Sequence, residues 1–113
     1  MAKYAVQANL TFDTPAKRNK LHDELLTKLA NKPTWGEVGI GASTDEDNRP
    51  AQSLLARYNY RADMNAMYEF IKDKMAKIPV LSGSVSRHVC GHDEGNHWNC
   101  RDDPKAEYKE VII

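Results

Sequence analysis

Side chains that can do chemistry gather in one short segment of this chain, between Arg87 and Cys100. The segment holds three of the four histidines and both cysteines. Two thiolates and two imidazoles form a tetrahedral donor set that suits zinc. We therefore predict a zinc site with the pattern C-x-H-x4-H-x2-C, whose ligands are Cys90, His92, His97 and Cys100.

The spacing of these ligands leaves other interpretations open. Residues two apart on a strand share a face about 7 Å from each other, so Cys90 and His92 can meet one ion while His88 lies too far along the strand. The spacing matches no standard zinc finger. Cys90 and Cys100 can instead face each other across a hairpin as a disulfide or redox-sensitive pair, and in a third interpretation these residues are unrelated.

Arginine and histidine residues predict a second site, for a small anionic ligand. In a strand expected over residues 52–61, Arg57 and Arg61 lie on the face opposite the apolar residues, and His88 of a later strand shares that face. Guanidinium groups bind carboxylates and phosphates through parallel hydrogen bonds. The ligand-binding residues of this hypothesis are Arg57, Arg61 and His88, and it assigns no catalytic residue.

The elements that carry these residues follow from the spacing of apolar side chains. Alternation of apolar and polar residues predicts strands, and recurrence every three to four residues predicts helices. Thr14 and Pro15 are typical of a helix start, and we expect Asp63 to cap a second helix that ends before Pro79. The expected elements are strands over 3–13, 35–44, 52–61 and 80–92 and helices over 15–31 and 63–78, and the sequence leaves open one more edge strand over 106–113.

The resulting order, strand–helix–strand–strand–helix–strand, resembles the ferredoxin-like superfold over residues 3–92. This α+β βαββαβ arrangement implies two helices on one face of a four-stranded antiparallel sheet, with the other face bare. We expect residues 1–113 to form a single domain, in which 93–113 is a C-terminal loop, hairpin or tail. The order also resembles that of dimeric α+β barrels, but folds of this kind host many functions.

Composition narrows the class of partner. The chain is 41% hydrophobic and 28% charged, which is typical of a folded protein. Its formal net charge is zero, so no overall field draws it to nucleic acid or anionic lipid. With no apolar run long enough to cross a bilayer and no signal peptide, we expect a cytoplasmic protein.

The sequence favours a small non-catalytic binding or assembly module, with zinc as its only expected cofactor. Because open sheet faces and edges need cover, we expect it to form a homodimer. The alternative is a small α+β barrel-type enzyme that uses the open sheet face as a pocket.

Overall fold

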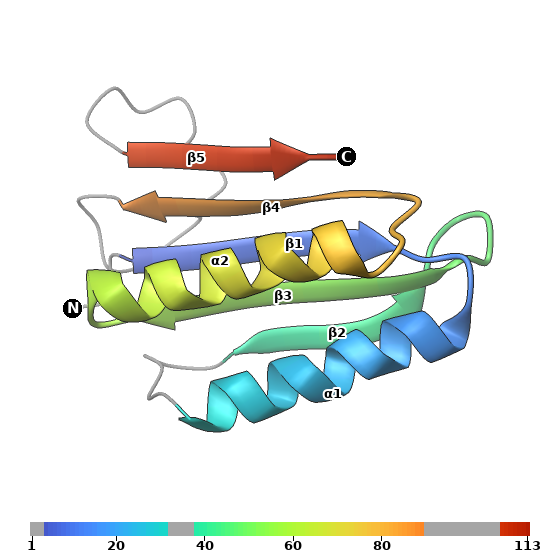
Figure 1. The fold of residues 1–113 in the computed structure, drawn as a ribbon, viewed down its shortest axis with the longest axis horizontal. Helices are drawn as coiled ribbons and strands as arrows, with labels where there is room; N and C mark the ends of the chain where they lie inside the picture. Colours follow the sequence, from blue (N-terminus) through green and yellow to red (C-terminus); the bar gives the residue numbers. More distant parts are fainter. Residues whose placement is uncertain (1–3, 32–37, 90–106) are drawn as a thin grey trace.

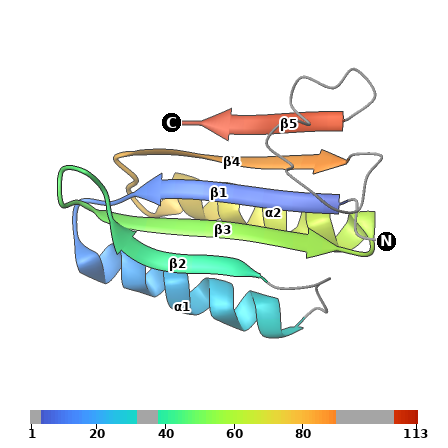
Figure 2. The same cartoon turned by 180° about the vertical axis from the view of Figure 1, so that it is seen from behind.

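The computed structural model describes residues 4–31, 38–89 and 107–113. These residues form β1 (Tyr4–Thr11), α1 (Pro15–Asn31), β2 (Gly39–Thr44), β3 (Pro50–Tyr58), α2 (Arg61–Lys77), β4 (Ser82–Val89) and β5 (Glu107–Ile112). The strands make one antiparallel sheet in the order β2-β3-β1-β4-β5. Both helices cover one face of this sheet, and the view from behind shows the strands of the other face (Figures 1 and 2).

This arrangement confirms the ferredoxin-like α+β fold. The sheet has five strands instead of the four that were expected, because the final edge strand that the sequence left open is present as β5 and pairs antiparallel with β4. Neither helix of the described residues is long and apolar enough to span a membrane.

The core lies between the sheet and the helices, and it follows the two periodicities of the sequence. Alternate residues of β1 point toward the helices, and the apolar stripes of α1 and α2 meet them. Each such side chain that is fully removed from water stabilises the fold by roughly 1.5–3 kcal/mol. The buried core includes Val6, Ala8, Leu10, Leu21, Leu25, Leu54, Tyr58, Met64, Tyr68, Ile71 and Val85.

The start of α1 agrees with the prediction, and the start of α2 does not. The backbone N–H of Lys17 donates to the Thr14 hydroxyl at 3.4 Å, which is a capping contact. Helix α2 begins at Arg61, with extended Tyr60 as its N-cap residue and no capping side chain. Asp63 therefore lies within the first turn, where its negative charge still favours the helix dipole.

Candidate functional site

A cavity of about 310 Å³ opens at the end of the sheet where α2 begins. We call it the basic cavity. It is lined by Arg61 and Met64 of α2, Arg87, His88 and Val89 of β4, and Glu107 and Lys109 of β5.

Strand register shows that most of this lining lies on the helix-covered side of the sheet. Arg87 is opposite Val6, which belongs to the core. Lys109 is opposite Arg87 in turn, so these residues share one face. His88 is opposite Ala5, so it belongs to the alternate set of residues, on the other face of the sheet. It borders the cavity because it lies between Arg87 and Val89 along β4.

Neutral groups hold the guanidinium of Arg87 in place. Its Nη1 donates a hydrogen bond to Oδ1 of Asn65 on α2. Its central carbon lies 5.4 Å from the centre of the Tyr68 ring, which is within range of a cation–π interaction. The Nε atom is buried and has no hydrogen-bond partner in the described part of the chain. Arg87 is thus fixed in position while one of its donors lacks an acceptor.

An ion pair between Arg61 and Glu107 links α2 to β5 beside the cavity. Nη1 of Arg61 lies 2.6 Å from Oε2 of Glu107. The hydrogen bond from Arg61 lowers the pKa of Glu107, and the charges of Arg61 and Arg87 act in the same direction. The same pairing raises the pKa of Arg61. At neutral pH the described lining therefore has three cations, Arg61, Arg87 and Lys109, and one carboxylate.

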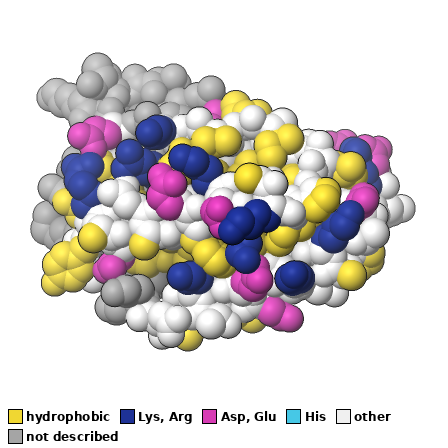
Figure 3. Space-filling view, in the orientation of Figure 1, with side chains coloured by type: hydrophobic (Ala, Val, Ile, Leu, Met, Phe, Trp, Pro, Cys, Tyr) yellow, Lys and Arg dark blue, Asp and Glu magenta, His cyan; other side chains and the backbone are white. Residues whose placement is uncertain are grey.

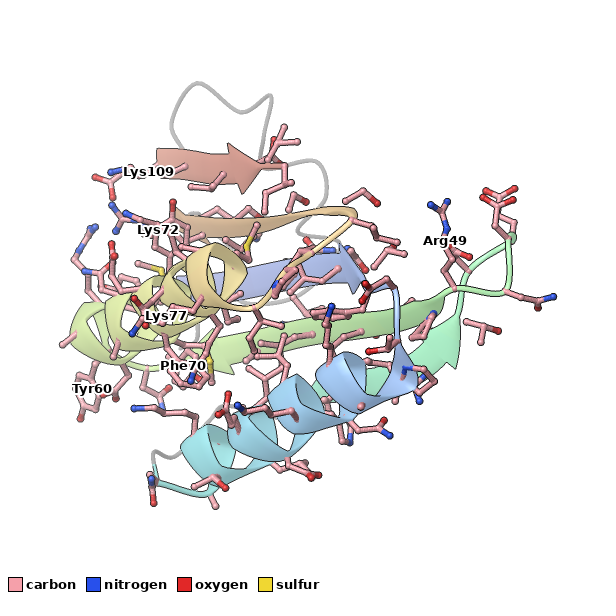
Figure 4. All side chains as sticks on the ribbon, turned by 45° about the vertical axis from the view of Figure 1, so that its right-hand side comes forward. Arg49, Tyr60, Phe70, Lys72, Lys77 and Lys109 are labelled. Atoms are coloured by element: carbon pink, nitrogen blue, oxygen red, sulfur yellow. The ribbon has the colours of Figure 1, made fainter. Side chains whose placement is uncertain are left out.

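Lys109 differs from the lysines of α2 on the helix-covered face. On that face Lys and Arg side chains lie among Asp and Glu side chains (Figure 3). For example, Nζ of Lys77 lies 2.9 Å from Asp73, and Nζ of Lys74 lies 3.1 Å from Glu24. Lys109, labelled on β5 in Figure 4, makes no ion pair within residues 4–31, 38–89 and 107–113.

Of the three residues that the sequence suggested for anion binding, Arg61 and His88 both border the basic cavity, and Arg57 is not part of its described lining. Arg57 and His88 both lie opposite Ala5, on the face that the helices leave open. Arg61 lies elsewhere, because β3 ends at Tyr58 and the chain has already turned into α2. The placement of Arg61 on the open face was therefore wrong.

The open face itself offers a poor site for an anion. Its hollow is lined by Gln7, Asn9, Ser53 and neighbouring residues of β2 and β3, and the described lining includes no charged side chain. Sequence analysis missed Asn65, Arg87 and Lys109. One signal was available: Arg87 has the parity of Val85 and Val89, so it is a charged residue on an otherwise apolar side of its strand.

The predicted zinc ligands Cys90, His92, His97 and Cys100 lie outside the described residues, so that site stays a prediction. Among the residues that the structure does describe, no group of three or more His, Cys, Asp or Glu side chains could hold a metal ion.

No protein-family model and no curated protein matches the sequence. A structure assigned as an antibiotic biosynthesis monooxygenase of Deinococcus radiodurans is 11% identical, covers 82% of this chain and 97% of its own, and has a TM-score of 0.50. A second structure with this assignment, from Chloroflexus aurantiacus, is 16% identical over 81% of this chain and 98% of its own, with a TM-score of 0.43. A dimeric ferredoxin-like protein from an uncultured marine organism is 15% identical over 85% and 94%, with a TM-score of 0.45.

The likeness to the Deinococcus radiodurans structure corrects the functional expectation from the sequence. The first neighbour has this fold and is assigned as an enzyme, which contradicts the non-catalytic binding or assembly module. The alternative, a small α+β barrel-type enzyme, agrees better with it. The physical reason for the error is that the element order was visible in the sequence, whereas the cavity between α2, β4 and β5 was not.

Proposed function

We propose that this chain is a small α+β barrel-type enzyme, an oxygenase that binds an organic anion in the basic cavity. The observation that carries the proposal is the excess of cations among the described residues that line the cavity, where Arg61, Arg87 and Lys109 accompany one carboxylate, that of Glu107. The oxygenase class is taken from the assignment of the Deinococcus radiodurans neighbour.

Each part of the cavity has a role in this proposal. Arg87, held by Asn65, offers the positive charge of its guanidinium to an anionic oxygen of the substrate. Val89 provides apolar surface for the carbon skeleton. Monooxygenation places one atom of dioxygen in the product and releases the other as water, which requires two electrons. A hydroxyaromatic substrate that is oxidised to a quinone would itself supply these two electrons and the two protons of the water.

The test is oxygen consumption by the purified protein with a panel of electron-rich hydroxyaromatic acids. We expect uptake with at least one acid, and we expect Arg87→Gln to abolish it. The control is Lys77→Gln, which removes a lysine of α2 that pairs with Asp73 away from the cavity. Arg87→Lys keeps the charge and tests whether the guanidinium itself is needed. No uptake with any acid, or full activity of Arg87→Gln, would contradict the proposal.

We also propose that the chain forms a homodimer. Strand β5 is a free edge among the described strands, and the side chains at its C-terminal end are exposed, Ile112 by 67% and Ile113 by 52%. Burial of these side chains against a second copy would be favourable. Light scattering over a range of protein concentrations should give twice the mass of the chain, and Ile112→Asp should return it to the monomer.

A further inference from the structure

Two cations of the basic cavity occupy directly opposite positions in the sheet. Arg87 of β4 pairs with Lys109 of β5 in the antiparallel ladder. Directly opposite residues have their Cβ atoms about 4.5–5.5 Å apart, and like charges at such positions destabilise a sheet. The fold therefore keeps a local arrangement that works against its own stability, as proteins do at functional sites.

The described surroundings relieve this repulsion only in part, because the charge of Glu107 acts on Arg61 first and on Arg87 less strongly. The one carboxylate in the lining, Glu107, accepts the hydrogen bond of Arg61 at 2.6 Å. The partner of Arg87 is a neutral amide, and its Nε has no acceptor within the described residues. The next cation outward, Lys72, lies 5.9 Å from the Tyr68 ring and pairs with Glu69 at 3.3 Å.

We infer that Arg87 and Lys109 together bind one compact, doubly charged group, and that the ligand of the basic cavity is a phosphate monoester. This inference rests on the proposed function in one respect, that the cavity is a substrate site. With Arg61 and Glu107 compensating each other, two positive charges remain on adjacent side chains. A monoanion neutralises one of them, whereas a dianion placed between them neutralises both.

The side chains suit the geometry of such a group. A phosphate monoester has three oxygens that accept hydrogen bonds and a charge near −2 at neutral pH. A guanidinium donates charge-assisted hydrogen bonds to such a group, and a lysine ammonium binds phosphate as a point charge. Val89 remains available for the organic part of the ester.

The test compares two ligands of the same shape and different charge. At about pH 8 phenyl phosphate is a dianion, because the second pKa of a phosphate monoester is about 6; phenyl sulfate has one negative charge. By titration calorimetry we expect phenyl phosphate to bind roughly tenfold more tightly, the effect of one further close charge pair at a partly exposed site. Lys109→Gln should remove this preference while leaving the binding of phenyl sulfate nearly unchanged, and the control Lys77→Gln should keep it.

The outcomes separate this inference from the proposed function. Equal affinity for the two ligands would overturn the dianion inference and leave the cavity as a site for monoanions. Absence of binding by either ligand, together with no oxygen uptake, would overturn both. Inorganic phosphate binding as tightly as phenyl phosphate would contradict the ester and point to the free ion.

Thermal unfolding without any ligand gives an independent measurement. If Lys109 and Arg87 repel each other, Lys109→Gln should raise the melting temperature at low ionic strength. The increase should shrink as salt is added, because salt screens charges at this partly exposed site. A lower melting temperature of Lys109→Gln at low salt would show that Lys109 already has a stabilising partner and would overturn the inference.

Discussion

Replacement of Gly83 by alanine tests how the sheet holds β4, the strand that carries Arg87. Gly83 has a φ of 141°, a conformation that side chains disfavour strongly. It lies opposite Leu10 in the ladder between β1 and β4. A Cβ atom at this position would overlap the carbonyl oxygen of Asn9 and would lie 2.8 Å from the Cα atom of Leu10.

The expected cost has two parts. The backbone conformation itself costs alanine about 1–3 kcal/mol. Because the overlapping atoms belong to the backbone of β1, β4 must also move away, which weakens about two ladder hydrogen bonds at roughly 0.5–1.5 kcal/mol each. Gly83→Ala should therefore lower the free energy of unfolding by about 2–6 kcal/mol, a large share of the 5–15 kcal/mol typical of a small domain.

The assay is equilibrium unfolding in urea, with Gly39→Ala as the matched control. A Cβ atom on Gly39 would make only an ordinary contact, 3.7 Å from Cβ of Leu55. That variant should be neutral or more stable by up to about 1 kcal/mol, because alanine restricts the unfolded chain. If Gly83→Ala costs no more than Gly39→Ala, the close approach of β4 to β1 is not as described.

Two further predictions concern the core. Ile71 of α2 is fully buried, so Ile71→Ala should lower the free energy of unfolding by about 2–5 kcal/mol in a urea titration. The control is Leu26→Ala, on the exposed surface of α1, which should lower it by less than about 1 kcal/mol. Burial, with a smaller contribution from the charge of Asp63, raises the pKa of Tyr58 to about 12. Its neutral form is favoured by folding, so this contribution to stability is complete below about pH 10 and is lost as the pH rises toward 12. Alkaline absorbance titration of the wild type minus Tyr58→Phe should show this late ionisation, and ionisation of every tyrosine by about pH 11 would refute it.

The fold could be predicted because the decisive signals are local. Alternation placed β1 and β3, and a helical stripe placed α2, since each element must turn one apolar face to a common core. The boundary between a strand and the next helix was harder to predict where the apolar pattern of the strand continued into the start of the helix. Apolar alternation continues past Tyr58 to Tyr60, but Tyr60 is 67% exposed and precedes the helix, so the pattern alone extended the strand too far.

The site depends on register, which a single sequence does not reveal. Arg87 and Lys109 are distant along the chain, and they meet only because β5 pairs with β4 with Val89 opposite Glu107. A shift of one residue would turn Lys109 to the other face of the sheet. The composition of the sequence drew attention to the cysteines and histidines beyond Val89. In the described part of the structure, the charged side chains of the site lie instead around Arg87, an arginine on the apolar side of its strand.

The position of the basic cavity in the fold strengthens its preference for anions. Helix α2 is 17 residues long and begins at Arg61, so its N-terminal end, with a partial positive charge, lies at the cavity. The acidic residue of its first turn, Asp63, lies on the other side of the helix start, near Tyr58 in a separate cavity. The helix dipole therefore adds to the charges of Arg87 and Lys109 without a carboxylate of α2 in the described lining to offset it. If this orientation matters, Asp63→Asn should leave the affinity for phenyl phosphate nearly unchanged, whereas Val89→Glu, which places a carboxylate in the lining of the cavity, should abolish binding.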